Sequence, residues 1–104
     1  MDKLVVQFAV AEDTDFDQLI SIEGALIREF LGDRANEVDG HDIGEGRFNI
    51  YVRLSKGWEP ALTRVTGVLD KLGLLSRAVV AKYRGSTEEY EVVHPDSYGG
   101  KFAL

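Results

Sequence analysis

An alternating apolar pattern at the start of the chain predicts a β-strand over residues 3–11. Its second face carries Val5, Gln7 and Ala9, so both faces are largely apolar. A strand of this kind is typical of the middle of a sheet, where both faces are covered. The apolar residues of the first face are Leu4, Val6, Phe8 and Val10.

An amphipathic helix is predicted over residues 16–31. Thr14 stands at the N-cap position, and Asp17 follows three residues later, where the acidic partner of a capping box belongs. Gly32 then ends the helix, because glycine is a common residue just after a helix C-terminus. The apolar positions expected to face the core are Phe16, Leu19, Ile20, Leu26, Ile27, Phe30 and Leu31.

Two further strands are predicted over residues 35–42 and 47–54. The glycines of Gly44-Glu45-Gly46 between them supply the backbone freedom that a tight hairpin requires. The second of these strands alternates regularly between apolar and polar residues, as expected for a sheet with one buried face. Its inward residues are expected to be Phe48, Ile50, Val52 and Leu54.

A second helix follows, with Trp58 and Pro60 in its first turn and its apolar stripe ending at Leu72. Glycine at position 67 costs about 1 kcal/mol relative to alanine, so we expect Gly67 to pack closely on the sheet. Strands over residues 77–84 and 89–94 come next, joined by a glycine-containing turn. The tail over residues 95–104 is expected to lie along the surface or a neighbouring molecule.

This order of elements predicts an α+β fold of the ferredoxin-like split β-α-β type. The order is β-α-β-β-α-β with an extra C-terminal strand, and right-handed crossovers place both helices on one face of an antiparallel sheet. We expect a single domain over residues 1–104, with its core at about 3–94. The residues expected on the open face of the sheet are Val5, Gln7, Ala9, Asn49, Tyr51, Arg53, Val80, Lys82 and Arg84.

Composition narrows the classes of function. A net charge of −6 argues against a nucleic-acid partner and against an anionic membrane, because both require a surplus of Lys and Arg. The chain contains no cysteine, which excludes disulfides and thiolate chemistry. No segment has the apolar character of a signal peptide or a membrane span, so we expect a cytoplasmic location.

Glu23 is unusual because it falls within the apolar stripe of the first helix. A carboxylate there is costly unless it is paired, and Arg47, Asn49 or free backbone N–H groups are its expected partners. Two readings remain open. Glu23 is either a structural carboxylate or a general acid or base whose pKa is raised by burial.

A cluster at the hairpin tip contains Asp39, His41, Asp42 and Glu45. Such a set could hold a divalent cation, but its spacing fits no calcium loop. Asp and Gly are also the ordinary residues of tight turns, where they bond to local backbone groups. We expect turn chemistry here, with no metal and no cofactor.

The same region resembles a segment found in a group of known proteins. Residues 39–50, Asp-Gly-His-Asp-Ile-Gly-Glu-Gly-Arg-Phe-Asn-Ile, resemble a D-G-x-D-x-G-x-G-x-x-N-I segment of a group of small bacterial proteins with the ferredoxin-like fold. The resemblance implies that fold. It implies no activity, because the group has no assigned chemistry.

The chain lacks a nucleophile motif, a phosphate-binding loop and a dinucleotide fingerprint. We therefore expect a non-catalytic protein-interaction or regulatory module rather than an enzyme. Its partner is expected to be another protein or a second copy, bound through the open sheet face or the last strand. The expected binding residues are Asp39, His41, Asp42, Glu45, Arg47, Asn49, Tyr51 and Arg53.

Two other classes of function stay open. One is a small-ligand sensor resembling ACT-like regulatory domains, which share this topology. The other is a cofactor-free enzyme resembling dimeric α/β-barrel proteins, with Glu23, His41 and Asp42 as its candidate catalytic residues.

Overall fold

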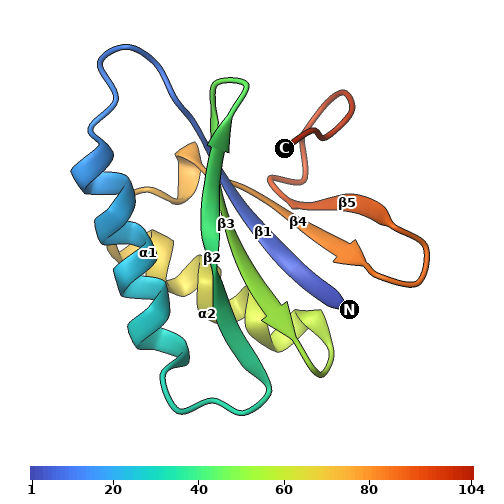
Figure 1. Cartoon of the computed structure of the whole chain (residues 1–104). Coiled ribbons are helices and arrows are strands. Elements are labelled where there is room, and N and C mark those ends of the chain that lie inside the picture. The colour runs from blue at the N-terminus through green and yellow to red at the C-terminus, as the bar shows by residue number, and fades with distance from the viewer.

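The computed structural model describes all 104 residues and contains one five-stranded antiparallel sheet with two helices on one face (Figure 1). The strand order is β2-β3-β1-β4-β5, so β1 lies at the centre, as predicted. The predicted fold class is confirmed. The elements are β1 (Asp2–Ala9), α1 (Phe16–Phe30), β2 (Asn36–Gly44), β3 (Arg47–Leu54), α2 (Trp58–Lys71), the 3-10 turn η1 (Leu75–Arg77), β4 (Val79–Arg84) and β5 (Glu89–His94).

The hydrophobic core lies between the sheet and the two helices. Alternate residues of β1 and β3 point into it, and the inward positions predicted for β3 are all buried. Burial of these side chains provides the main driving force for folding. Neither helix is long and apolar enough to cross a membrane. The strand residues of the core are Leu4, Val6, Phe8, Phe48, Ile50, Val52, Leu54 and Val80.

The prediction for β4 was wrong about which side chains face the helices. Val80 pairs with Val6, which places Val80, Lys82 and Arg84 on the helix face rather than the open face. Lys82 is buried there, with Nζ 4.2 Å from the centroid of the Trp58 ring. Because Val79, Val80 and Ala81 are all apolar, the sequence alone does not indicate which alternate residues of β4 point towards the helices.

Helix α1 differs from its prediction in how its apolar residues are distributed. Asp15, not Thr14, is the N-cap, and its side chain accepts a hydrogen bond from the backbone N–H of Gln18. Ile22 is buried in the core. Four residues assigned to the core are instead exposed, because α1 lies beside the edge strand β2 and only one of its sides faces the sheet (Figure 1). These are Phe16, Ile20, Ile27 and Leu31.

The predicted close packing of Gly67 is also wrong. Gly67 is exposed on α2, and no atom lies within 4 Å of the position that a Cβ would take. This helix therefore carries the conformational cost of glycine without a packing compensation.

The C-terminal tail crosses back onto the open face of the sheet (Figure 1). The side-chain amide of Gln7 donates to the carbonyl of Ala103 at 2.7 Å. The ring of Phe102 lies 5.4 Å from that of Tyr90, and the Tyr90 ring lies 4.8 Å from that of Tyr83. The tail thus covers part of the sheet face that was predicted to be open.

Asp33 holds the loop between α1 and β2. Its carboxylate accepts hydrogen bonds from the backbone N–H groups of Ala35 and Asn36, from the Asn36 side chain and from Arg64 of α2. The backbone donor at Ala35 is the largest cause, and together these donors lower the pKa of Asp33 from 3.8 to about 2. Arg64 also donates to the carbonyl of Glu29, which ties α2 to the end of α1.

We predict that Asp33→Asn lowers the free energy of unfolding at neutral pH. Because the folded pKa lies below the ordinary value, the contribution of Asp33 is fully present above about pH 4 and is lost as the pH falls towards 2. Urea unfolding at several pH values should therefore show a gap between the two proteins that closes over that interval. Asp70→Asn, at an exposed aspartate of α2, is the control. A gap that stays constant with pH would contradict the prediction.

Candidate functional site

The β2–β3 hairpin owes its shape to two glycine-dependent features. Glu45 and Gly46 form the turn, and both have positive φ, 55° and 74°, as a two-residue type I′ turn requires. Farther down β2 the pairing register shifts between Val38 and His41, so that Asp39 and Gly40 together oppose Tyr51. Gly40 has a φ of 97°, which is typical of a bulge built on glycine.

A chain of hydrogen bonds crosses three strands on the open face. Asp42 accepts from the Asn49 amide at 2.9 Å and from the Tyr51 hydroxyl at 2.7 Å. The carbonyl oxygen of the Asn49 side chain accepts from Gln7 at 3.0 Å, and Gln7 continues to Ala103 in the tail. Asn49 and Gln7 are both buried, so the network satisfies polar groups that would otherwise be costly.

Two tyrosines of the open face, Tyr51 and Tyr90, have raised pKa values. Burial, and then the hydrogen bond to the Asp42 carboxylate, raise the pKa of Tyr51 well above its usual value of 10. Burial is also the largest cause of the raised pKa of Tyr90, followed by the charges of Tyr83 and Asp42. Both phenols are therefore protonated at neutral pH, and that of Tyr51 donates to Asp42.

On the other face of the sheet, His41 pairs with Glu23 of α1. The Nδ1 atom of His41 lies 2.9 Å from both carboxylate oxygens of Glu23, whose side chain is only 12% exposed. The imidazole stacks on the ring of Phe48 at a centroid distance of 4.9 Å. Glu23 is thus paired, but the expected partners Arg47 and Asn49 were wrong.

The Glu23–His41 pair has the geometry of a carboxylate that orients an imidazole. In catalysis such a pair also needs an aligned nucleophile or substrate group. The structure assigns Asp42, the other candidate catalytic residue, to the opposite face, where Asn49 and Tyr51 occupy both of its oxygens. The three candidate residues therefore do not converge on one point.

The acidic cluster at the hairpin tip is likewise separated. His41 faces the helices, Asp42 faces the open side, and Glu45 lies in the turn. No group of three or more His, Cys, Asp or Glu side chains is arranged to hold a metal ion.

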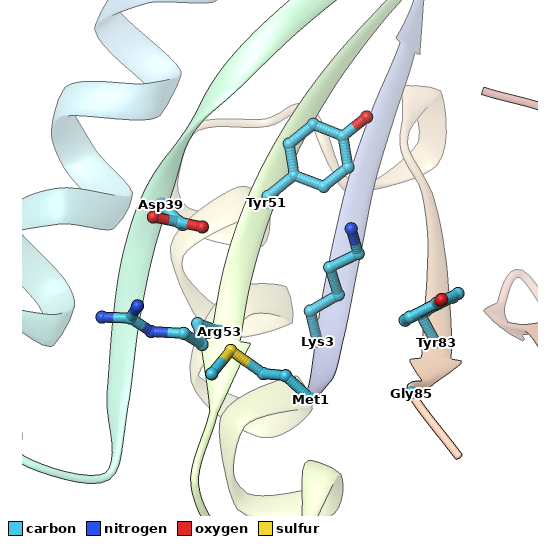
Figure 2. A pocket seen from close by; sticks show the side chains of 7 residues that line it. All are labelled: Met1, Lys3, Asp39, Tyr51, Arg53, Tyr83 and Gly85. Carbon is cyan, nitrogen blue, oxygen red and sulfur yellow. The ribbon is translucent and has the colours of Figure 1, made fainter. Parts of the chain in front are cut away.

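A shallow pocket of about 270 Å³ opens on the uncovered part of the sheet face (Figure 2). Lys3 lies between two tyrosines, with Nζ 4.6 Å from the ring centroid of Tyr51 and 4.9 Å from that of Tyr83. Asp39 and Arg53 line the opposite side, and Arg53 pairs with Glu37 at 2.8 Å. Lys3 gives the pocket a positive charge, and Asp39 places a negative charge on its opposite side. Lys3 and Tyr83 were not singled out in the sequence, because only the strand register brings them to Tyr51 and Arg53.

Exposed apolar side chains gather where α1 lies beside β2. Eight large apolar residues are exposed in the whole chain. Four of them belong to these two elements, and a fifth, Leu31, is the C-cap of α1. Leu31, at the end of α1, is 81% exposed. We call this surface the α1–β2 flank; it consists of Phe16, Ile20, Ile27, Leu31 and Ile43 together with the outer edge of β2.

A groove of about 360 Å³ runs along the flank between the end of α1 and the start of β2. Ile27, Leu31 and Val38 supply apolar walls. Asn36 also lines the groove, and its Oδ1 is a buried acceptor without a hydrogen-bond partner. Buried acceptors are rarely left unpaired, so this atom is a local cost in the fold.

The helical residues of the flank were predicted to lie in the core, which is wrong. A signal was nevertheless present, because α1 carries too many apolar residues for one stripe. Leu19, Ile22, Leu26 and Phe30 already form a complete buried face, so the remaining apolar positions form a second stripe.

Comparison with protein-family models, curated proteins and solved structures finds no match to this chain.

We predict that Gly40→Ala lowers the free energy of unfolding by about 1–2 kcal/mol, because a Cβ is strained at positive φ. Gly67→Ala is the matched control. It removes a glycine from an exposed helix and should raise stability by about 0.5–1 kcal/mol. Chemical denaturation of both variants measures the two effects, and equal signs would contradict the assigned bulge.

We predict that Asp42→Asn lowers the pKa of Tyr51, because the variant removes the negative charge that faces the phenol while burial remains. Titration of tyrosinate absorbance, with Tyr51→Phe to identify the transition, measures the change. Asp39→Asn is the control on the same strand. An unchanged Tyr51 transition in Asp42→Asn would refute the role given to the carboxylate.

Proposed function

We propose that this chain is a non-catalytic protein-interaction module that binds its partner through the α1–β2 flank. The observation that carries the proposal is the gathering of five exposed large apolar side chains beside an unpaired sheet edge. Contiguous apolar surface next to polar residues is typical of protein-binding sites. An edge strand adds a row of free N–H and C=O groups that a partner can pair with.

The two sheet edges differ in this respect. At the other end of the sheet, β5 carries the exposed glutamates Glu89 and Glu91 and no exposed large apolar side chain. The β2 edge also carries exposed acidic residues, but it has in addition an exposed large apolar side chain, Ile43, and α1 lies along it.

The polar residues of the hairpin support this reading over catalysis. Asp42, Asn49 and Tyr51 are bonded to one another, and His41 is bonded to Glu23. These bonds leave the side chains as fixed structural groups, which favours a rigid binding surface.

The test is photo-crosslinking with a benzophenone amino acid at Ile20. We expect covalent adducts with a polypeptide when the protein is irradiated pure or in extract of its host cells, and mass spectrometry identifies the adduct. Ile27→Glu in the same chain should abolish the adduct, because it places a charge in the centre of the flank. Leu72, the C-cap residue of α2, is the control position, 46% exposed against 50% for Ile20, and it should give none. Equal labelling from both positions, or none from Ile20, would overturn the proposal.

A further inference from the structure

The exposed apolar residues of α1 form a stripe whose spacing is the same from either end of the helix. Its residues Phe16, Ile20, Ile27 and Leu31 are separated by four, seven and four positions. When two copies of α1 pack antiparallel, Phe16 of one therefore lies opposite Leu31 of the other, and Ile20 lies opposite Ile27. This reciprocal matching is what a two-fold symmetric interface requires.

The midpoint of the stripe falls between Glu23 and Gly24. Gly24 has no side chain, and the only atom within 4 Å of its would-be Cβ is the tip of Arg28, at 3.5 Å. A glycine inside a helix costs about 0.5–1 kcal/mol, and here it leaves room for a second helix to approach at the point of crossing.

Charge beside the stripe is also self-complementary. Asp17 and Arg28 are exposed, stand eleven positions apart and so share one side of the helix, about three turns from each other. Neither takes part in an ion pair within the chain. In the antiparallel arrangement, Asp17 of each copy lies near Arg28 of the other, which gives two symmetric pairs of opposite charge.

The sheet edge fits the same arrangement. β2 runs beside α1 (Figure 1), and the Glu23–His41 contact joins the two elements. A two-fold axis that pairs the α1 helices therefore brings the two β2 edges together in antiparallel orientation.

Resting on the proposed function, we infer that the partner on the α1–β2 flank is a second copy of this chain, bound about a two-fold axis near Gly24. The interface pairs α1 with α1 and sets the two β2 edges side by side. The apolar stripe supplies burial, and the Asp17–Arg28 pairs fix the antiparallel direction.

Charge reversal tests this inference by sedimentation equilibrium. The unaltered chain should be a dimer. Asp17→Arg and Arg28→Asp should each weaken it about ten-fold or more, because like charges then face each other. An equimolar mixture of the two variants should dimerise again, as should the double variant, because opposite charges are restored in both.

Helix α2 provides the matched controls, since Glu59 lies in its first turn and Lys71 in its last. Glu59→Arg and Lys71→Asp impose the same cost on the helix dipole and should leave the dimer intact. Circular dichroism checks that each variant is folded.

A monomeric unaltered chain would overturn the inference, as would single variants that dimerise normally or a mixture that stays monomeric. The proposed function fails separately. Adducts from Ile20 with a different polypeptide, together with a monomeric chain, would refute self-association and leave the interaction module standing. Absence of any adduct would refute both.

Discussion

One extra residue in β2 decides which face each side chain of the hairpin takes. Side chains of a strand alternate between the two faces of a sheet, and the bulge at Gly40 shifts that alternation by one position. His41 consequently turns towards α1, and Asp42 turns towards the open face. Without the bulge, Asp42 would face the helix layer and the imidazole would face Asn49. The Glu23 pair and the network of the open face both depend on this shift.

The exposed flank follows from how few elements cover this sheet. Two helices lie over one face of five strands, and the tail covers part of the other through Gln7 and Tyr90. Nothing in the chain lies beyond α1 at the β2 edge (Figure 1). The apolar side chains there stay in water, and they are too many and too close together to resemble the scattered apolar residues of an ordinary surface.

The sequence predicted the element order, the fold class and the inward face of β3, because alternation and turn glycines are local signals. Features that depend on the packing of neighbouring elements were predicted wrongly. The face of Lys82 is set by pairing with β1, and the partner of Glu23 is set by the bulge, which no local pattern of Asp39-Gly40 distinguishes from a turn. The hairpin residues were found as candidates, but their division between two faces was not. The exposure of the apolar stripe of α1 was not predicted, because helical periodicity identifies an apolar side but not the element that packs against it.

The Glu23–His41 pair gains a physical role from its position. The flank has one part on a helix and one on a strand, and the proposed binding through both requires that the two parts keep a fixed relation. Both oxygens of Glu23 meet Nδ1 of His41, and stacking on Phe48 holds the ring that carries it. The hydrogen bond between Asp33 and Arg64 fixes the loop that connects α1 to β2. The carboxylate on the apolar stripe therefore joins the two halves of the flank, and its burial is understood without any reaction at that point.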